Sequence, residues 1–158
     1  MGRLQKAFAI GGAAVVTLLM GLALAVPAYA EEDVMPTSTE DKWFSFSLSS
    51  YGDVDGTAWR EKNDYTATYV NPTYFQGYRC RVYVDGSRLE DHSDRDQGCT
   101  IGEPYLFGTG QFVIHNNVKE RGNSYAQMTV WACESGSTRT YGWWSPDVTD
   151  ASKYTSLN

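Results

Sequence analysis

The chain has 158 residues, with 13 basic and 19 acidic residues and a net charge of −6, a length suited to one domain. This acidic balance excludes nucleic acid as a natural partner and disfavours attachment to anionic lipid, because like charges repel. Aromatic residues make up 14% of the chain, while leucine occurs only at positions 48, 89, 106 and 157 of the segment 31–158. Such a composition favours β-sheet over a helix bundle.

The first thirty residues have the three parts of a secretory signal peptide. Arg3 and Lys6 supply a positive start, residues 7–26 form an apolar run, and Ala28 and Ala30 supply the small residues of a cleavage site. We therefore expect a signal-peptide helix cleaved after Ala30, and a secreted protein with no membrane span after processing. An uncleaved anchor is the alternative, since about 20 apolar residues can span a bilayer. Cleavage leaves 11 basic and 19 acidic residues and a net charge of −8.

Composition divides the chain into four parts. Residues 1–30 are the signal peptide, and residues 31–42 are a polar, flexible leader interrupted by Pro36. Residues 43–148 are expected to form a single β domain. Residues 149–158 are expected to be a loose C-terminal tail.

Six segments alternate apolar and polar residues with the period of a half-buried strand. They are residues 43–50, 65–71, 77–87, 111–116, 125–134 and 138–144. In the first segment Phe44, Phe46 and Leu48 alternate with serines, so these three side chains are expected to face a core. Turn residues separate the segments. The pattern predicts an all-β fold, a small antiparallel β-sandwich or barrel of about six strands.

One long block carries a family resemblance. The stretch IHNNVKERGNSYAQMTVWACESGSTRTYGWWSPD has an IHN-VK strand, a G-SYA strand start and a closing G-W-SP-D. It resembles the C-terminal half of small exported β-rich proteins of Gram-positive bacteria, and WFSFSLSSYG and YVN are similar to their N-terminal half. The resemblance covers most of residues 43–148 and implies no established catalytic residues. More distantly, the chain is similar to lactococcin-type bacteriocins, small secreted β-sandwich proteins, and this likeness concerns architecture.

Three cysteines in an exported chain predict one disulfide and one spare thiol. Cys80–Cys99 is the favoured bridge, because it would close a long polar loop onto the strand that the loop leaves. Cys99–Cys133 and Cys80–Cys133 remain open alternatives. With the favoured bridge, Cys133 is the spare thiol. A cysteine hydrolase built from Cys133, His115 and Asn116 is a remote alternative, since adjacent strand residues point to opposite faces.

Two acidic loops offer oxygen ligands without a clear metal site. Asp53 and Asp55 occur in DVDGT, and Asp91, Asp94 and Asp96 occur in DHSDRDQG, at spacings found in calcium loops. The first loop lacks the glycine that an EF-hand requires, and an arginine interrupts the second. We expect solvated acidic turns, with the second trio as weak calcium candidates, and no cofactor.

The aromatic surplus is the strongest functional signal. Tryptophan and tyrosine side chains on outward strand faces can contact sugar rings or protein partners, although cross-strand core packing is the alternative. The candidates for ligand contact are Trp59, Tyr83, Trp131, Tyr141 and Trp144. The sequence therefore predicts a secreted, non-catalytic protein. It is either a bacteriocin-like protein that binds an extracellular protein or cell-envelope component, or a carbohydrate-binding module.

Overall fold

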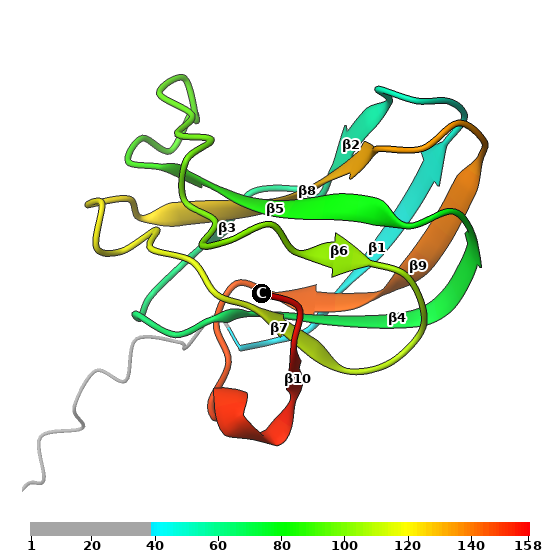
Figure 1. Cartoon of the computed structure of the whole chain (residues 1–158). Coiled ribbons are helices and arrows are strands. Elements are labelled where there is room, and N and C mark those ends of the chain that lie inside the picture. The colour runs from blue at the N-terminus through cyan, green and yellow to red at the C-terminus, as the bar shows by residue number, and fades with distance from the viewer. Residues whose placement is uncertain (1–38) are drawn as a thin grey trace, which may run out of the picture. The chain divides into compact units, whose positions relative to one another are not determined.

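The computed structural model of the chain describes residues 39–158, so the expected signal helix and cleavage site lie outside the described residues. Within residues 39–158 the protein is all-β, with two five-stranded sheets and one short 3-10 helix (Figure 1). In spatial order the first sheet contains β1 (Lys42–Leu48), β9 (Thr138–Ser145), β4 (Thr68–Gly77), β7 (Phe112–Ile114) and β10 (Thr155–Ser156). The second contains β2 (Val54–Gly56), β8 (Tyr125–Ala132), β5 (Cys80–Ser87) and β6 (Tyr105–Leu106), and β3 (Arg60–Glu61) also pairs with β8.

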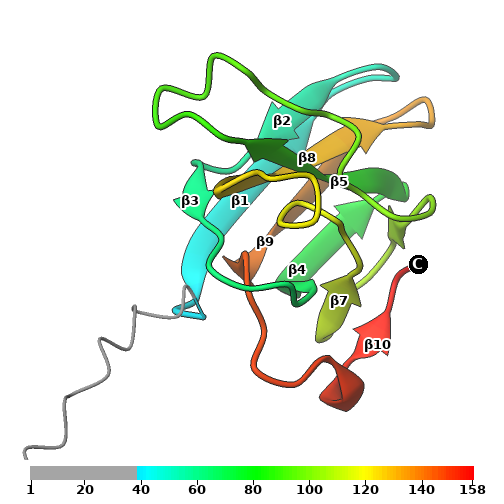
Figure 2. The ribbon, with the colours of Figure 1, turned by 90° about the vertical axis from the view of Figure 1, so that its left-hand side faces the viewer.

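The two sheets are open and face each other across one core, as in a sandwich rather than a closed barrel (Figures 1 and 2). From the first sheet, Phe44, Phe46 and Leu48 are buried in this core and alternate with exposed residues, so the predicted period of two is confirmed. From the second sheet, β5 and β8 contribute alternating buried residues such as Val82 and Val130. The alternation therefore leaves each sheet with an outer face.

Strand β4 is longer than the sequence predicts, because it continues through Pro72 to Gly77. The register with β9 shifts between Pro72 and Tyr74, and proline is tolerated in a strand at such an irregularity. Gly142 of β9 makes this possible, since a Cβ there would lie 2.0 Å from the Asn71 carbonyl oxygen and 2.7 Å from the Cα atom of Pro72. The extension adds Tyr74 and Gln76 to the outer face of the first sheet.

The C-terminal residues are part of the sheet rather than a loose tail. After the 3-10 helix η1 (Ala151–Lys153), β10 pairs in parallel with β7 (Figure 1). Tyr154 packs on the outer face of the first sheet, with its ring centroid 4.9 Å from that of Tyr69. Asn158 accepts a 2.7 Å hydrogen bond from the His115 backbone amide. This segment covers one end of the outer face and leaves the other end open.

A buried ion pair joins the two sheets at one end of the core. Lys62, which follows β3, and Asp147, which follows β9, have side chains that are 1% and 0% exposed, and Lys62 Nζ lies 2.8 Å from Asp147 Oδ1. The same ammonium group donates 2.7 Å hydrogen bonds to the carbonyl oxygens of Thr66 and Pro146. Asp147 also accepts from the backbone amide of Asn63. Burial lowers the pKa of Lys62, and the charge of Asp147 opposes that shift.

Replacing Lys62 with methionine should lower the free energy of unfolding by about 3–5 kcal/mol, because it leaves the buried Asp147 carboxylate without its counter-charge. Urea denaturation at pH 7 measures this difference. The control is Lys42→Met, which removes the half-exposed Lys42–Glu40 pair and should cost about 0–1 kcal/mol. Equal losses in the two variants would show that the buried pair does not anchor the fold.

Candidate functional site

The aromatic residues selected from the sequence are divided among three places. Tyr141 lies on the outer face of the first sheet, Tyr83 and Trp131 lie on the outer face of the second, and Trp59 lies in the short connection between β2 and β3. Trp144 was expected to be exposed, and this prediction is wrong. Its side chain is 1% exposed and forms part of the core. No single surface therefore collects the predicted candidates.

Trp143, rather than Trp144, is the exposed member of this pair, because successive strand residues point to opposite faces. Thr138, Thr140, Gly142 and Trp144 are the inward residues of β9, so Trp143 must point outward and is 40% exposed. The sequence pair WW does not reveal which of its members faces in.

The outer face of the first sheet carries a cluster of four aromatic side chains, Trp43, Tyr74, Tyr141 and Trp143, here named the aromatic face. Three of them are exposed hydrophobic residues, and Trp43 is 52% exposed. The Trp43 ring lies 5.3 Å from Tyr141 and 5.2 Å, edge-on, from Trp143. Tyr74 and Tyr141 stack in parallel, with centroids 4.6 Å apart and planes 4° apart. Of this cluster, only Tyr141 was predicted from the sequence as a binding residue.

A polar pocket continues the aromatic face along the same three strands. It has a volume of about 600 Å³ and is here named the Arg139 pocket. Its lining residues are Ser47, Leu48, Ser49, Gln76, Gly77, Tyr78, Ser137 and Arg139. The register explains the continuity: Tyr141 pairs with Ser45 and Tyr74, and two residues further along Arg139 pairs with Ser47 and Gln76. The Tyr74 hydroxyl also donates a 2.5 Å hydrogen bond to the Gln76 side-chain oxygen.

The outer face of the second sheet carries a smaller groove of about 270 Å³, lined in part by Tyr83 and Trp131. Its charged groups are paired with each other. Asp85 accepts hydrogen bonds from the Arg95 guanidinium and, at 2.7 Å, from the Thr129 hydroxyl. The guanidinium of Arg81 lies 5.6 Å from the centroid of the Trp131 ring. Both charged side chains that line the groove, Asp85 and Arg95, are therefore engaged with each other.

Comparison with known proteins identifies the family. Residues 26–148 match the family described as protein of unknown function DUF2712. The chain belongs to this family. No curated protein and no solved structure matches it. The matched range ends just after Asp147, so the DUF2712 match includes both partners of the buried ion pair and all of the aromatic face.

Trp59 of this DUF2712 chain is occupied by an intramolecular contact. Its ring stacks on His92, with centroids 4.7 Å apart and planes 18° apart. His92 also lies edge-on to Tyr125, at 5.1 Å. The three rings link the loop after β5 to the start of β8. We assign Trp59 to loop anchoring rather than ligand contact.

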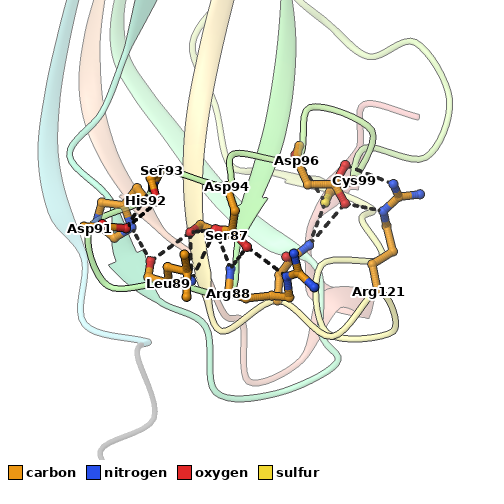
Figure 3. Close-up of polar contacts among 11 residues, drawn as sticks. Ser87, Arg88, Leu89, Asp91, His92, Ser93, Asp94, Asp96, Cys99 and Arg121 are labelled. Carbon is orange, nitrogen blue, oxygen red and sulfur yellow. Dashed lines mark hydrogen bonds and ion pairs between the residues drawn. The ribbon is translucent and has the colours of Figure 1, made fainter.

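The acidic loop after β5 uses its carboxylates to hold its own turns (Figure 3). Asp91 accepts from Ser93, Asp94 accepts from Ser87 and Arg88, and Asp96 pairs with Arg121 at 2.6 Å. The hydrogen bond from Ser87 and that from Arg88 lower the pKa of Asp94, and the hydrogen bond from Arg121 lowers the pKa of Asp96 to about 2. The structure thus gives each weak calcium candidate a separate set of partners.

Two negative findings apply to the described part of the chain. Within residues 39–158 no group of three or more His, Cys, Asp or Glu side chains is placed to hold a metal ion. In the same residues no helix is long and apolar enough to cross a membrane.

The three cysteines are free in the structure, so the favoured Cys80–Cys99 bridge is not formed. Cys80 is the first residue of β5. Cys99 packs against Gly86, which lies six residues further along β5, and a Cβ added to Gly86 would lie 2.8 Å from the Cys99 sulfur. Six strand residues span about 20 Å, and disulfide Cα atoms lie within about 7 Å. Cys133 lies near the Cys80 end, with its thiol 3.4 Å from the Arg79 carbonyl oxygen. The register therefore rules out both bridges to Cys99.

Cys133 is also remote from its suggested catalytic partners. It lies beside Arg79, just beyond the Gly77 end of β4, while His115 follows Ile114, which pairs with Thr68 at the opposite end. The ten residues of β4 separate the two side chains by about 30 Å. This geometry gives no support to a hydrolase built on Cys133.

Native protein at pH 8 should react with one equivalent of a thiol reagent, at Cys133. Burial raises the pKa of Cys80 to about 12 and that of Cys99 to about 11, so both stay protonated and inaccessible. Counting labelled thiols by mass, before and after denaturation, should give one and then three. A count of one after denaturation would contradict the free thiols and leave Cys80–Cys133 as the bridge that the register permits.

Proposed function

We propose that this DUF2712 protein is an exported, non-catalytic binding protein whose target is a glycan of a cell envelope. The observation that carries the proposal is the aromatic face, with Trp43 and Trp143 exposed at 52% and 40% beside a polar pocket. Tryptophan and tyrosine present large, rigid contact surfaces, which suit sugar rings. Hydroxyl, amide and guanidinium groups in the adjoining pocket suit the hydroxyls of the same ligand.

Export is supported by the signal-peptide pattern of residues 1–30 and by the likeness to small exported proteins of Gram-positive bacteria. The small two-sheet fold is also compatible with a lactococcin-like bacteriocin, which would place the glycan on the envelope of another cell. A cysteine hydrolase is disfavoured because Cys133 and His115 lie at opposite ends of β4.

The protein recovered from culture medium should have the intact mass of a chain that starts at Glu31. The reason is that Ala28 and Ala30 place the cleavage site directly before it. Intact-mass spectrometry of the medium and of the membrane fraction makes the measurement. Recovery of the full 158-residue chain in the membrane fraction would contradict export.

Replacing Trp43 and Trp143 together with alanine should weaken binding to an envelope glycan by about tenfold or more, as expected for the loss of two central aromatic contacts. The measurement is co-sedimentation of residues 31–158 with insoluble peptidoglycan, chitin and cellulose. The control is Tyr65→Ala, which removes a 69% exposed aromatic side chain outside the face. Each variant must keep the melting temperature of the parent protein.

Two outcomes would contradict the proposal: no glycan sediments the parent protein, or the double variant binds as well as the parent. Sugar binding in the groove of the second sheet is the second candidate, favoured by the position of Trp131 on its wall. Loss of binding in Trp131→Ala, with the double variant unaffected, would select the groove instead.

A further inference from the structure

The Arg139 pocket has the chemistry of an anion site. We propose that the pocket binds an isolated anionic group, either a carboxylate or a phosphodiester, on an otherwise neutral glycan. This proposal rests on the proposed function, in which the sugar rings of the same glycan contact the aromatic face.

Arg139 is the one arginine of residues 39–158 whose guanidinium has no partner in the structure. Arg60 donates to the carbonyl oxygen of Trp144 and lies 5.5 Å from its ring centroid. The others pair with carboxylates, and they are Arg79, Arg81, Arg88, Arg95 and Arg121. In so acidic a chain, an unpaired guanidinium in a pocket is an exception. A planar guanidinium matches carboxylate and phosphate oxygens with two parallel hydrogen bonds.

The lining of the pocket is complementary to negative charge. It contains no Asp or Glu residue. Ser47, Ser137 and Tyr78 provide hydroxyl groups, and the Gln76 amide oxygen already accepts from Tyr74, which leaves the amide nitrogen to donate. The Ser49 hydroxyl donates a 2.6 Å hydrogen bond to Asp53, so Ser49 is engaged. An anion beside Arg139 would therefore meet donors on several sides.

The position of the pocket defines the rest of the ligand. Arg139 lies two residues from Tyr141 on β9, a spacing of about 7 Å along a strand. A glycan lying along β9 could place one sugar ring against Tyr141 and the charged group of the adjacent sugar beside Arg139. The mature chain has a net charge of −8, which repels densely charged polymers. The ligand chemistry that fits both facts is a mostly neutral glycan with spaced anionic groups.

The test compares Arg139→Gln, which keeps hydrogen-bonding capacity and removes the charge, with Lys119→Gln. Lys119 lies in the turn before β8, away from the aromatic face, and its replacement changes the net charge by the same amount. Three soluble probes are titrated by calorimetry at low and high salt. They are a neutral oligomer of N-acetylglucosamine, a peptide-free peptidoglycan strand with a lactyl carboxylate on alternate sugars, and an otherwise neutral oligosaccharide in which one phosphodiester joins two sugars. Melting temperatures verify that both variants are folded.

Arg139→Gln should lose about tenfold to a hundredfold affinity for one anionic probe, the range for hydrogen bonds to charged groups, and keep its affinity for the neutral oligomer. Lys119→Gln should bind all probes as the parent does. The probe for which Arg139→Gln loses affinity shows whether the bound anionic group is a carboxylate or a phosphodiester. Unchanged affinity of Arg139→Gln for both anionic probes overturns this inference and leaves the proposed function intact. A parent protein that binds none of the three probes, nor any insoluble glycan, overturns the proposed function itself.

Discussion

The buried pair of Lys62 and Asp147 is the interaction on which the arrangement of the two sheets depends. Lys62 follows the last residue of β3, and Asp147 follows β9, so one ion pair connects the ends of strands from different sheets. Every proton of the ammonium group has an acceptor, and the carboxylate also accepts from the Asn63 amide. A buried charge pair is tolerated only when its remaining hydrogen-bonding capacity is satisfied in this way. The closing SPD motif of the sequence supplies both the Pro146 carbonyl and the Asp147 carboxylate.

The surface that we propose for binding is the part of the outer faces that the other described segments leave open. The C-terminal segment packs Tyr154 onto Tyr69 at one end of the first sheet. On the second sheet, Arg95 of the acidic loop lies over Asp85, which is 2% exposed. The aromatic face and the Arg139 pocket, across β1, β9 and β4, remain open. Contiguous exposed apolar side chains mark interaction sites more often than single ones do, which is why we propose binding there.

Local pairing of charges explains how an acidic protein can offer a cationic pocket. Asp94 and Asp96 are neutralised by arginines and by backbone and hydroxyl donors within their own loop and the facing turn (Figure 3). Asp53 is held by Ser49 and Ser50. Because most arginines serve such pairs, a single unpaired guanidinium stands out in the structure. The negative net charge disfavours the approach of polyanions at long range, but the charge inside the pocket is positive because Arg139 is its only charged lining residue.

Much of the fold was predictable from the period of two alone. It identified six segments that correspond to β1, β4, β5, β7, β8 and β9, and it placed Phe44, Phe46 and Leu48 in the core. The short strands β2, β3, β6 and β10 have two or three residues each and, unlike β7, do not lie within a longer alternating segment. Their existence depends on hydrogen bonds to longer strands, which the sequence does not display.

The sequence by itself determined the all-β class and which residues of most longer strands face inward, because alternation is a local property of extended chain, whereas the choice between sandwich and barrel came from the strand pairing. Only the tertiary structure decided that Trp143 is outside and Trp144 inside, because the sequence does not show which face of β9 lies against the other sheet. Only the tertiary structure separated Cys80 from Cys99 along β5. The Arg139 pocket likewise exists because three strands distant in the sequence meet in one register, and such long-range pairing leaves no mark on any single segment.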